Sequence, residues 1–388
     1  MSSNWSYEKI GEVMSVERGG SPRPIKKYLT DAEDGLNWIK ISDATASDKY
    51  IYKTKQKITK EGLHKTRLVN EGDFLLSNSM SFGRPYIMRT SGCIHDGWLV
   101  LKEKNKGMLD KDFLYYLLGS PYIFEQFDKL AAGSTVRNLN IALVSSVEIP
   151  ILPLTEQKQI VALLDQAFKA IDQAQQNIEK NIANAKELFQ SKLNAIFSQT
   201  GEGWEERSLG DVAEYDKTRY LNTDKPYVGL EHIESETGFY LGDNTPATVK
   251  SSTFQFDNRH VLYGRLRPYL NKVLIPNFSG HCSTEIFPIL PSKELDKGFL
   301  FYWLMSPQTV TKINATWTGA RMPRANMNEV IKFKLNIPSE DIQIKLVSKL
   351  DKLKASLDSL ISNYEKKNQN LEELKKSILQ KAFNGELT

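Results

Sequence analysis

The sequence predicts an α+β fold in which two similar mixed α/β domains alternate with two long helices. Three observations support this prediction. Residues 109–121 recur as residues 295–307, with nine identities in thirteen positions at a shift of 186 residues. Each copy is followed by a long stretch whose apolar residues recur in steps of four and three. The chain of 388 residues also exceeds one ordinary core and fits two domains.

The bulk composition is that of an ordinary globular protein, with 40% hydrophobic and 25% charged residues. A net charge of +4 permits nucleic-acid binding without requiring it. Cys93 and Cys282 give no disulfide framework, which favours a reducing compartment. The sequence has neither an apolar run of about 18 residues nor an apolar segment at its start. We therefore expect a cytoplasmic protein without membrane association.

Residues 1–153 are predicted to form the first mixed domain. Short β-favouring runs, separated by Gly, Asn, Asp and Pro, are residues 38–41, 74–76 and 98–101. Two short helices follow, one over residues 113–118 and one beginning at Pro121, because proline suits a first helical turn. Residues 149–153 contain two prolines and are predicted to be a turn that closes the domain.

Residues 154–200 are predicted to form the first long helix. The apolar positions of its heptad pattern are Ile160, Leu164, Ala167, Ile171, Ala174, Ile178, Ala185 and Leu188. Thr155 is expected to cap the helix, and Lys158 stands where a capping box usually has glutamate, so the cap is partial.

The second half repeats this scheme, with a domain over residues 201–338 and a helix over residues 339–388. The heptad positions of this helix are Leu346, Leu350, Leu353, Leu357, Leu360, Tyr364, Leu371, Leu374 and Ile378. Asn181 and Lys367 occupy the same polar position of the two patterns. They either fix the register of the helices or mark a solvated interruption where the helices separate.

Two matched helices in one chain are natural partners, because neither can bury its apolar seam alone. Each has some 44 residues and would be roughly 65 Å long. We predict an antiparallel coiled coil in which the second helix returns to the first domain, so that the halves are related by a pseudo-two-fold axis. The segment around Trp204 has its counterpart at Trp5, at the start of the chain. The sequence is therefore a circularly permuted repeat.

Two similar domains on a rigid spacer match the two-fold symmetry of duplex DNA, which presents equivalent faces to two such modules. Between the shared segments the two domains have diverged. We therefore expect two half-sites of different sequence.

The chain resembles the specificity (S) subunits of type I restriction–modification systems, which carry two target recognition domains separated by two helical spacers. The segments that carry the resemblance are residues 5–13, 72–75, 151–161, 265–272 and 374–387. Their order and duplication extend over the whole chain. One departure lies in residues 337–343, where the proline and Glu-Gln pattern of the first spacer is degraded.

The resemblance implies a non-catalytic subunit that recognises double-stranded DNA at a bipartite, asymmetric site. It implies assembly with two modification (methyltransferase) subunits and with restriction (translocase–nuclease) subunits, so that the complex methylates adenine or restricts DNA. The cofactors would belong to the partners: S-adenosylmethionine to the modification subunits, ATP and magnesium to the restriction subunits. No cofactor is expected on this chain itself.

Motifs for catalysis are nearly absent from the sequence. It lacks an Asn/Asp-Pro-Pro-aromatic methyltransferase box and a Gly-x4-Gly-Lys-Ser/Thr phosphate loop. Glu156-x-Lys158 matches part of a nuclease centre but has no second acidic partner in a strand. Cys93-x-His95 and His281-Cys282 favour buried side chains under a strand over metal ligands. Two rival functions are a fused nuclease and a coiled-coil adaptor that binds only proteins.

The DNA-binding candidates of the first domain are mostly basic. Lys53, Lys55 and Lys57 alternate, so on a strand they would share one face. That face suits either phosphate neutralisation or the protection of an edge strand. The other candidates are Arg67, Arg84, Tyr86, Arg137 and Asn138.

The candidates of the second domain are Arg219, Arg259, Arg265, Arg267, Tyr269, Arg321 and Arg324. Arginine in a loop can pair bidentately with guanine, which makes the arginines of this group the best candidates for base contacts. Residues 267–269 have a parallel in residues 84–86, both reading Arg-Pro-Tyr. A feature kept in both halves favours phosphate contact or folding over base choice.

Overall fold

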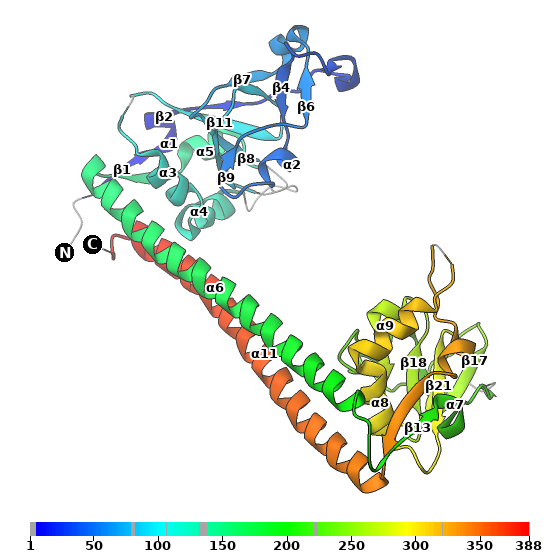
Figure 1. The fold of residues 1–388 in the computed structure, drawn as a ribbon. Helices are drawn as coiled ribbons and strands as arrows, with labels where there is room; N and C mark the ends of the chain where they lie inside the picture. The colour runs from blue at the N-terminus through cyan, green and yellow to red at the C-terminus, as the bar shows by residue number, and fades with distance from the viewer. Residues whose placement is uncertain are drawn as a thin grey trace. The chain divides into compact units, whose positions relative to one another are not determined.

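In the computed structural model, the duplicated sequence folds as two mixed domains, each followed along the chain by a long helix (Figure 1). The structure describes residues 5–78, 82–105, 107–131, 138–220, 224–319 and 321–387. The chain divides into two compact units, one of Met1–Asn177 with Lys367–Thr388 and one of Ile178–Lys366. The end of the chain thus belongs to the same unit as its beginning, which confirms the circular permutation.

The domain of the first unit contains two five-stranded sheets and a two-stranded sheet. Its strands are β1 (Ser6–Lys9), β2 (Met14–Arg18), β3 (Leu29–Thr30), β4 (Leu36–Ile39), β5 (Tyr50–Ile51), β6 (Gln56–Ile58), β7 (Arg67–Val69), β8 (Phe74–Ser77), β9 (Pro85–Met88), β10 (Gly92–Ile94), β11 (Trp98–Glu103) and β12 (Glu148–Ile151). The sheet orders are β2-β11-β8-β9-β5, β3-β6-β4-β10-β7 and β1-β12.

Short helices cover this domain: α1 (Ile10–Val13), α2 (Ile41–Ala44), α3 (Lys111–Leu118), α4 (Pro121–Ala131) and α5 (Ile141–Ser146), with 3₁₀ turns η1 (Ile25–Lys27) and η2 (Lys60–Lys65). The expected strands over residues 74–76 and 98–101 and the helix beginning at Pro121 are confirmed. The run over residues 38–41 is a strand only as far as Ile39. The predicted turn over residues 149–153 is wrong, because most of it lies in β12. Pro150 is tolerated there because β12 is an edge strand paired with β1.

The domain of the second unit repeats the central strand order. Its strands are β13 (Trp204–Ser208), β14 (Ala213–Tyr215), β15 (Arg219–Tyr220), β16 (Tyr227–Val228), β17 (Thr253–Phe256), β18 (Val261–Gly264), β19 (Val273–Leu274), β20 (Gly280–Ser283), β21 (Ile286–Pro291) and β22 (Lys334–Pro338). The sheet β14-β21-β18-β19 corresponds to β2-β11-β8-β9, and the pair β13-β22 corresponds to β1-β12. We call strands and residues at the same place in this shared order cognate.

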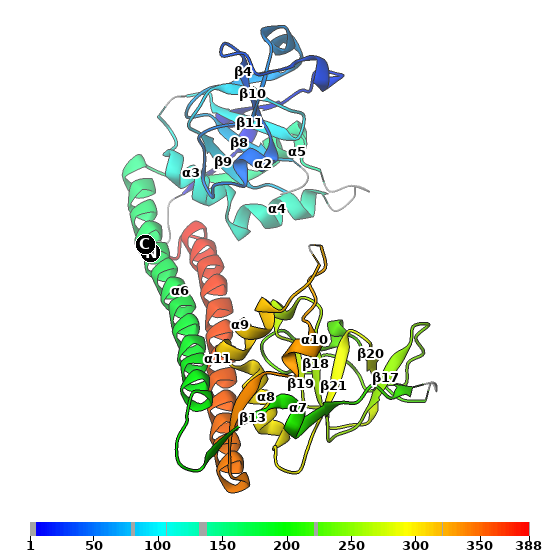
Figure 2. The same ribbon diagram turned by 45° about the vertical axis from the view of Figure 1, so that its right-hand side comes forward.

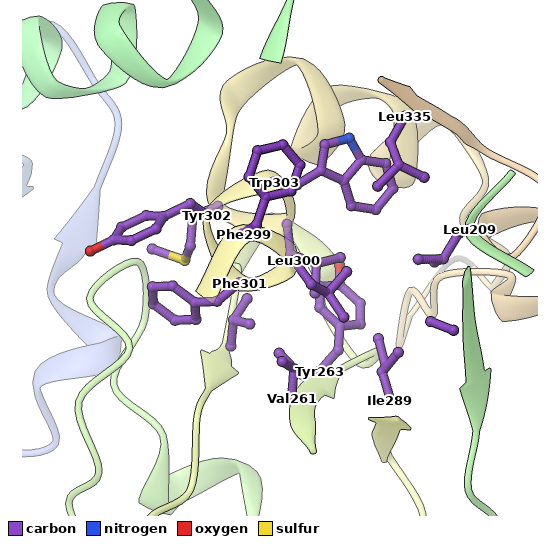
Figure 3. Close-up of a cluster of buried hydrophobic side chains, with 14 of the residues drawn as sticks. Leu209, Val261, Tyr263, Ile289, Phe299, Leu300, Phe301, Tyr302, Trp303 and Leu335 are labelled. Atoms are coloured by element: carbon purple, nitrogen blue, oxygen red, sulfur yellow. The ribbon is translucent and has the colours of Figure 1, made fainter. Parts of the chain in front are cut away.

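The helices of the second domain are α7 (Leu209–Val212), α8 (Lys297–Met305), α9 (Pro307–Ala315) and α10 (Met327–Val330), with 3₁₀ turns η3 (Leu230–His232) and η4 (Pro268–Leu270). Every residue of α8 from Gly298 to Met305 is buried, as expected of a helix that is apolar on all faces. Figure 3 shows its Phe299, Leu300 and Trp303 within the same buried cluster as Val261 and Ile289 of the sheet. This helix therefore forms the centre of the second core.

The two spacer helices are α6 (Leu154–Phe197) and α11 (Glu340–Phe383), each of 44 residues. In the first unit, Lys375 Nζ lies 2.6 Å from Asp172 Oδ1, and Gln175 Nε2 donates to Glu372 Oε1 at 2.6 Å. Residue numbers therefore rise along one helix as they fall along the other. The predicted antiparallel pairing is confirmed, and Figure 2 shows the two helices side by side.

The buried face of each helix departs from the predicted heptad pattern. Leu188 is 58% exposed, and its neighbour Phe189 is buried instead. Leu360 and Leu374, also predicted in the seam, are 39% and 46% exposed. The physical reason is that a helix of 3.6 residues per turn drifts by about 20° per heptad, so the contact face moves off a strict seven-residue repeat.

The polar positions of the pattern lie at the rim of the helix contact. Asn181 is exposed, yet its Nδ2 donates to Tyr364 Oη at 3.2 Å within the second unit. Lys367 is also exposed. The expected cap at Thr155 is wrong, because α6 already begins at Leu154 and Thr155 lies inside its first turn.

One buried glutamine joins each domain to its spacer helix. Gln157 Oε1 accepts from the amide of Asp110 at 2.7 Å, and its Nε2 donates to the carbonyls of Met108 and Leu152 at 2.9 and 2.8 Å. Gln343 makes the cognate contacts, with the amide of Asp296 and the carbonyls of Glu294 and Pro338, all at 2.9 Å. The contacts between the second domain and its spacer helix are therefore retained, although the sequence pattern of the first spacer is degraded in residues 337–343.

Aromatic residues repeat the same correspondence. Phe197, at the end of α6, packs on Phe299 with ring centroids 5.0 Å apart. Phe383, at the end of α11, packs on Phe113 with centroids 5.4 Å apart. Each domain is therefore held by the beginning of one spacer helix and the end of the other.

Candidate nucleic-acid interface

Two arginines and a glutamate form an ion-paired group at the end of β18 in the second domain; we call Arg265, Glu285 and Arg324 the arginine–glutamate cluster. Arg324 Nε donates to both carboxylate oxygens of Glu285 at 2.9 and 3.1 Å, and its Nη2 lies 2.9 Å from Oε1. Arg265 Nε donates to Oε2 at 3.0 Å. The guanidinium of Arg265 also lies over the ring of Phe287, 5.5 Å from its centroid.

Backbone hydrogen bonds bring the three members together from distant parts of the sequence. The amide of Arg265 donates to the carbonyl of Glu285, which precedes β21, at 2.9 Å. The carbonyl of Arg265 accepts from the amide of Ala325, next to Arg324, at 2.9 Å. The cluster is therefore attached to the sheet through main-chain contacts as well as through ion pairs.

The electrostatics of the cluster keep Glu285 ionised. Burial alone would raise the pKa of this carboxyl, but the hydrogen bonds from Arg324 and Arg265 outweigh burial and hold the pKa below its usual range. The charge of the cluster is therefore two cations and one anion, with all three side chains only partly exposed.

Exposed side chains lie in the segments that border this cluster, residues 265–272, 316–319 and 321–326. Arg267 is exposed and has a left-handed backbone with φ of 51°, and its amide donates to the carbonyl of Pro323 at 2.7 Å. A non-glycine residue held in this conformation is typical of functional sites. The large exposed side chains are Tyr269, Trp317 (53% exposed), Arg321 and Met322.

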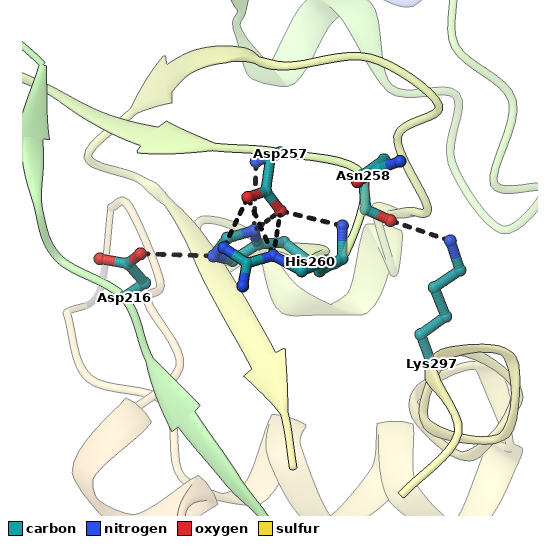
Figure 4. A network of polar contacts seen from close by, with 6 residues as sticks. Asp216, Asp257, Asn258, His260 and Lys297 are labelled. Atoms are coloured by element: carbon teal, nitrogen blue, oxygen red, sulfur yellow. Dashed lines mark hydrogen bonds and ion pairs between the residues drawn. The ribbon is translucent and has the colours of Figure 1, made fainter. Parts of the chain in front are cut away.

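Arg259, another candidate, lies at the opposite end of β18 from Arg265 and Arg267. Its side chain is bonded to Asp257, with Nη2 2.7 Å from Oδ2. Figure 4 shows the neighbouring network, in which Asp257 and Asp216 flank the buried His260 at 2.9 and 3.4 Å. Lys297 Nζ extends the network by donating to the carbonyl of Asn258 at 2.8 Å.

The remaining candidate of this domain, Arg219, is exposed at the start of β15. That strand belongs to the sheet β15-β17-β20-β16. Arg219 is therefore on a different sheet from the arginine–glutamate cluster.

The three lysines of the first domain do not share a strand face, so that prediction is wrong. Lys57 lies in β6, whereas Lys53 and Lys55 lie in the loop before it. Lys57 Nζ is bonded to the carbonyl of Glu33 at 2.9 Å. Lys53 and Lys55 are exposed. The strand interpretation failed because β5 ends at Ile51, which leaves four loop residues before β6.

Arg67 and Arg84 are surface residues with acidic partners. Arg67 Nε lies 3.1 Å from Glu17 Oε2, and Arg84 Nη2 lies 3.2 Å from Asp48 Oδ1. Asn138 is half-buried in the loop before α5. Arg137 lies outside the described residues.

Tyr86 was predicted to contact DNA, and this prediction is wrong because its side chain is completely buried. Its ring packs edge-on against Trp98 with centroids 5.7 Å apart, and burial raises the pKa of its hydroxyl. In β9 Tyr86 lies opposite Leu75, the position taken by Leu274 opposite Leu262 in the second domain. The two Arg-Pro-Tyr segments are therefore not cognate, since residues 267–269 precede β19.

The two thiols behave as packed side chains. Cys93 and Cys282 are both completely buried, and burial raises the pKa of each thiol. Within the described part of the chain, no three His, Cys, Asp or Glu residues are grouped as metal ligands would be. Glu156, considered above for a nuclease centre, accepts a hydrogen bond from Trp5 Nε1 at 2.8 Å.

Sequence reasoning missed Glu285 and Trp317. Glu285 is 20 residues from Arg265 and 39 from Arg324, and no local pattern marks it. Trp317 follows a helical segment, and its sequence position gave no sign that its ring would be exposed. In the described ranges, no helix is both long and apolar enough to cross a membrane.

Known proteins share this arrangement of two domains and two helices. The family model for the type I restriction modification DNA specificity domain matches residues 2–183 and 201–373. The chain belongs to this family. A relative in the specificity domain family, the MjaVIII specificity subunit of Methanocaldococcus jannaschii, is 24% identical over 99% of this chain and 93% of its own. The EcoDI specificity subunit of Escherichia coli is 23% identical over 72% of this chain and 71% of its own.

Two solved structures match the fold of this chain along almost its entire length. The crystal structure of the HsdS subunit from Thermoanaerobacter tengcongensis matches with a TM-score of 0.58 and 19% identity, covering all of this chain and 98% of that chain. A chain from a structure on complex assembly and conformational transition of the type I R-M system matches with a TM-score of 0.77 and 17% identity, covering 99% of both chains. The predicted fold class is confirmed.

Proposed function

We propose that this chain is the non-catalytic DNA-specificity subunit of a type I restriction–modification complex. Each domain recognises one half of a bipartite, asymmetric DNA site, and the paired spacer helices set the distance between the halves. The subunit directs adenine methylation or restriction, which its partners carry out. Two modification subunits would hold S-adenosylmethionine, and the restriction subunits would hold ATP and magnesium.

The observation that carries this proposal is the contrast between shared framework and diverged surface. Both domains have the same order of four strands in the central sheet and the same glutamine junction to a spacer helix. Their exposed loops differ, and the arginine–glutamate cluster of the second domain is not repeated at the cognate positions Asn78, Gly97 and Asn138. A common support with two different surfaces is what an asymmetric bipartite site requires.

The proposed DNA contacts on each domain are mostly basic side chains at its surface. In the first domain they are Lys53, Lys55, Arg67 and Arg84, together with the consecutive residues Arg137 and Asn138. In the second they are Arg265, Arg267 and Arg321, with Tyr269, and Arg324 lies beside Arg265 in its ion pair with Glu285. Arg219 and Arg259 lie farther away as candidate phosphate contacts. Phosphate contacts supply affinity and base contacts supply specificity.

Methylome sequencing of the source cell tests the proposal directly. Deleting the gene should abolish methylation at one bipartite adenine motif, and restoring it should bring the motif back. Replacing residues 201–338 with the cognate domain of a relative should change one half of the motif and leave the other intact. An unchanged methylome after deletion would contradict the proposal.

The two rival functions are separated by biochemistry on the purified chain. The proposal predicts no cleavage of duplex DNA with magnesium alone, whereas a fused nuclease would cut. It also predicts duplex binding that weakens steeply with salt, because neutralising phosphates releases counterions. A protein-only adaptor would show no such binding.

A further inference from the structure

The two arginines of the arginine–glutamate cluster differ in how many of their nitrogens bind Glu285. Arg324 uses Nε and Nη2 on the carboxylate of Glu285, and its Nη1 points to the carbonyl of Met322 at 3.4 Å. Arg265 uses only Nε, at 3.0 Å from Oε2. Its two terminal nitrogens have no partner within the described ranges, and one face of its guanidinium is covered by Phe287. Arg265 thus presents a fixed pair of free donors.

The same backbone framework exists in the first domain without these charges. Asn78 is cognate to Arg265, because its amide donates to the carbonyl of Gly97 at 3.0 Å and its carbonyl accepts from Leu139 at 2.8 Å. Asn78 is buried, and its Nδ2 is bonded to the carbonyl of Asp96 at 2.7 Å. The framework therefore folds without an arginine, so Arg265 and Glu285 are not needed to form it.

We propose that Arg265 recognises a guanine in the half-site of the second domain, and that Glu285 and Arg324 are positioning residues that hold it. This inference rests on the function proposed above. The two free terminal nitrogens match the O6 and N7 acceptors that guanine presents in the major groove. Glu285 fixes Nε, and Arg324 fixes Glu285.

The carboxylate of Glu285 makes Arg265 a weaker phosphate ligand than an arginine without an acidic partner, because it offsets much of the charge of the guanidinium. A phosphate next to Arg265 would also lie near the ionised carboxylate of Glu285, and the two anions would repel each other. A guanine edge carries no net charge, so the carboxylate does not oppose it. The exposed Arg267 and Arg321, which border the cluster, are the better phosphate ligands.

Binding of the full chain to a pool of duplexes, scored base by base, tests the proposal. Arg265→Ala should reduce the preference for guanine at one position of one half-site by about 5- to 150-fold and leave the other half-site unchanged. Arg265→Lys should keep most of the affinity but lose the same preference, since lysine lacks the planar fork. The lysine variant also guards against a misfolded alanine variant.

The positioning role has its own signature. Arg324→Ala and Glu285→Gln should weaken preference at the position affected by Arg265→Ala, and the double variant Arg265→Ala/Arg324→Ala should lose no more than Arg265→Ala alone. Arg207→Ala is the matched control: Arg207 is an ion-paired arginine of β13 in the same domain, 3.4 Å from Glu294 Oε2, and its removal should not alter this preference.

Two outcomes would overturn the inference alone, and a third would overturn the proposed function. An equal loss of affinity for all duplexes in Arg265→Ala would make Arg265 a phosphate contact. A second relaxed position in Arg324→Ala would show that Arg324 reads a base itself. A wild-type chain that binds duplexes with no base preference at all would instead refute the proposed function, so the two failures can be told apart.

Discussion

A single glutamine side chain attaches each domain to its spacer helix. Gln157 and Gln343 are both buried, and each uses its amide group to satisfy one main-chain amide and two main-chain carbonyls. These groups belong to the last residues before α3 or α8 and to the segment that enters the spacer. A buried polar group without a hydrogen-bond partner lowers the stability of the fold. Each glutamine satisfies three such groups, so we expect it to contribute strongly to the free energy of unfolding.

Replacing either glutamine should destabilise its own junction. Gln157→Ala or Gln343→Ala should lower the free energy of unfolding by about 1–3 kcal/mol, because buried backbone groups lose their partners. Gln159→Ala is the control, since Gln159 is exposed on α6. Urea denaturation measures the effect, and equal stability of the Gln157 and Gln159 variants would contradict the assigned role.

Acid should weaken the network around Asp257. The hydrogen bond from Arg259 is the largest of the effects that lower the pKa of this carboxyl well below its usual value of 3.8. A lowered pKa stabilises the fold at pH values above the usual value, and this stabilisation is lost as pH falls through the lowered pKa. Asp216, on the other side of His260, also has a lowered pKa: burial opposes the shift, but hydrogen bonds from Thr218 and His260 outweigh it.

Unfolding of wild type and Asp257→Asn over a range of pH checks this prediction. The stability difference between them should be full at neutral pH and should shrink as pH falls below about 4. Asp341→Asn, at an exposed position of α11, serves as control. If the stability difference between wild type and Asp257→Asn grew as the pH fell, the predicted direction of the pH dependence would be wrong.

At the scale of elements, the spacer helices are defined by which face is buried. Leu350 lies in the second core and is almost fully buried, whereas Leu360, ten residues later on the same helix, is 39% exposed. Leu350→Ala should cost about 2–5 kcal/mol of unfolding free energy, since it leaves a cavity. Leu360→Ala should cost no more than about 0.5 kcal/mol. Thermal unfolding distinguishes this buried face from the strict heptad, which predicts comparable losses.

The sequence predicted most of the elements and missed the contacts that join them. Long helices were predictable because their apolar spacing is periodic over 44 residues. The lysine stretch was misread because alternating residues in a loop look like a strand. The Arg-Pro-Tyr parallel failed because the two segments differ in strand register. Glu285 was invisible because its partners are distant in sequence and the pairing depends on the sheet.

The whole molecule should act as a ruler for its DNA site. Deleting residues 179–185 from α6 together with residues 361–367 from α11 removes one heptad from each spacer, at facing positions near the Asn181–Tyr364 contact. The spacers would shorten by about 10 Å, at 1.5 Å per residue. The gap between half-sites should then shrink by roughly three base pairs at 3.4 Å each, with both half-site sequences retained.

Methylome sequencing of cells carrying the double deletion measures this gap. A deletion in α6 alone is the control, and it should abolish methylation of the motif because the two helices no longer pair in register. An unchanged gap in the double deletion would refute the ruler.

The matched glutamine junctions have a consequence for how such proteins change. Gln157 and Gln343 bind main-chain groups of their domains. Their hydrogen bonds therefore do not depend on which side chains the domain carries on its DNA-binding surface. A replacement domain needs these backbone positions and an aromatic residue at the place of Phe113 or Phe299, which packs on the end of the other spacer helix. A new DNA specificity can therefore be acquired by exchanging one whole domain, without changes in the spacer helices or in the other domain.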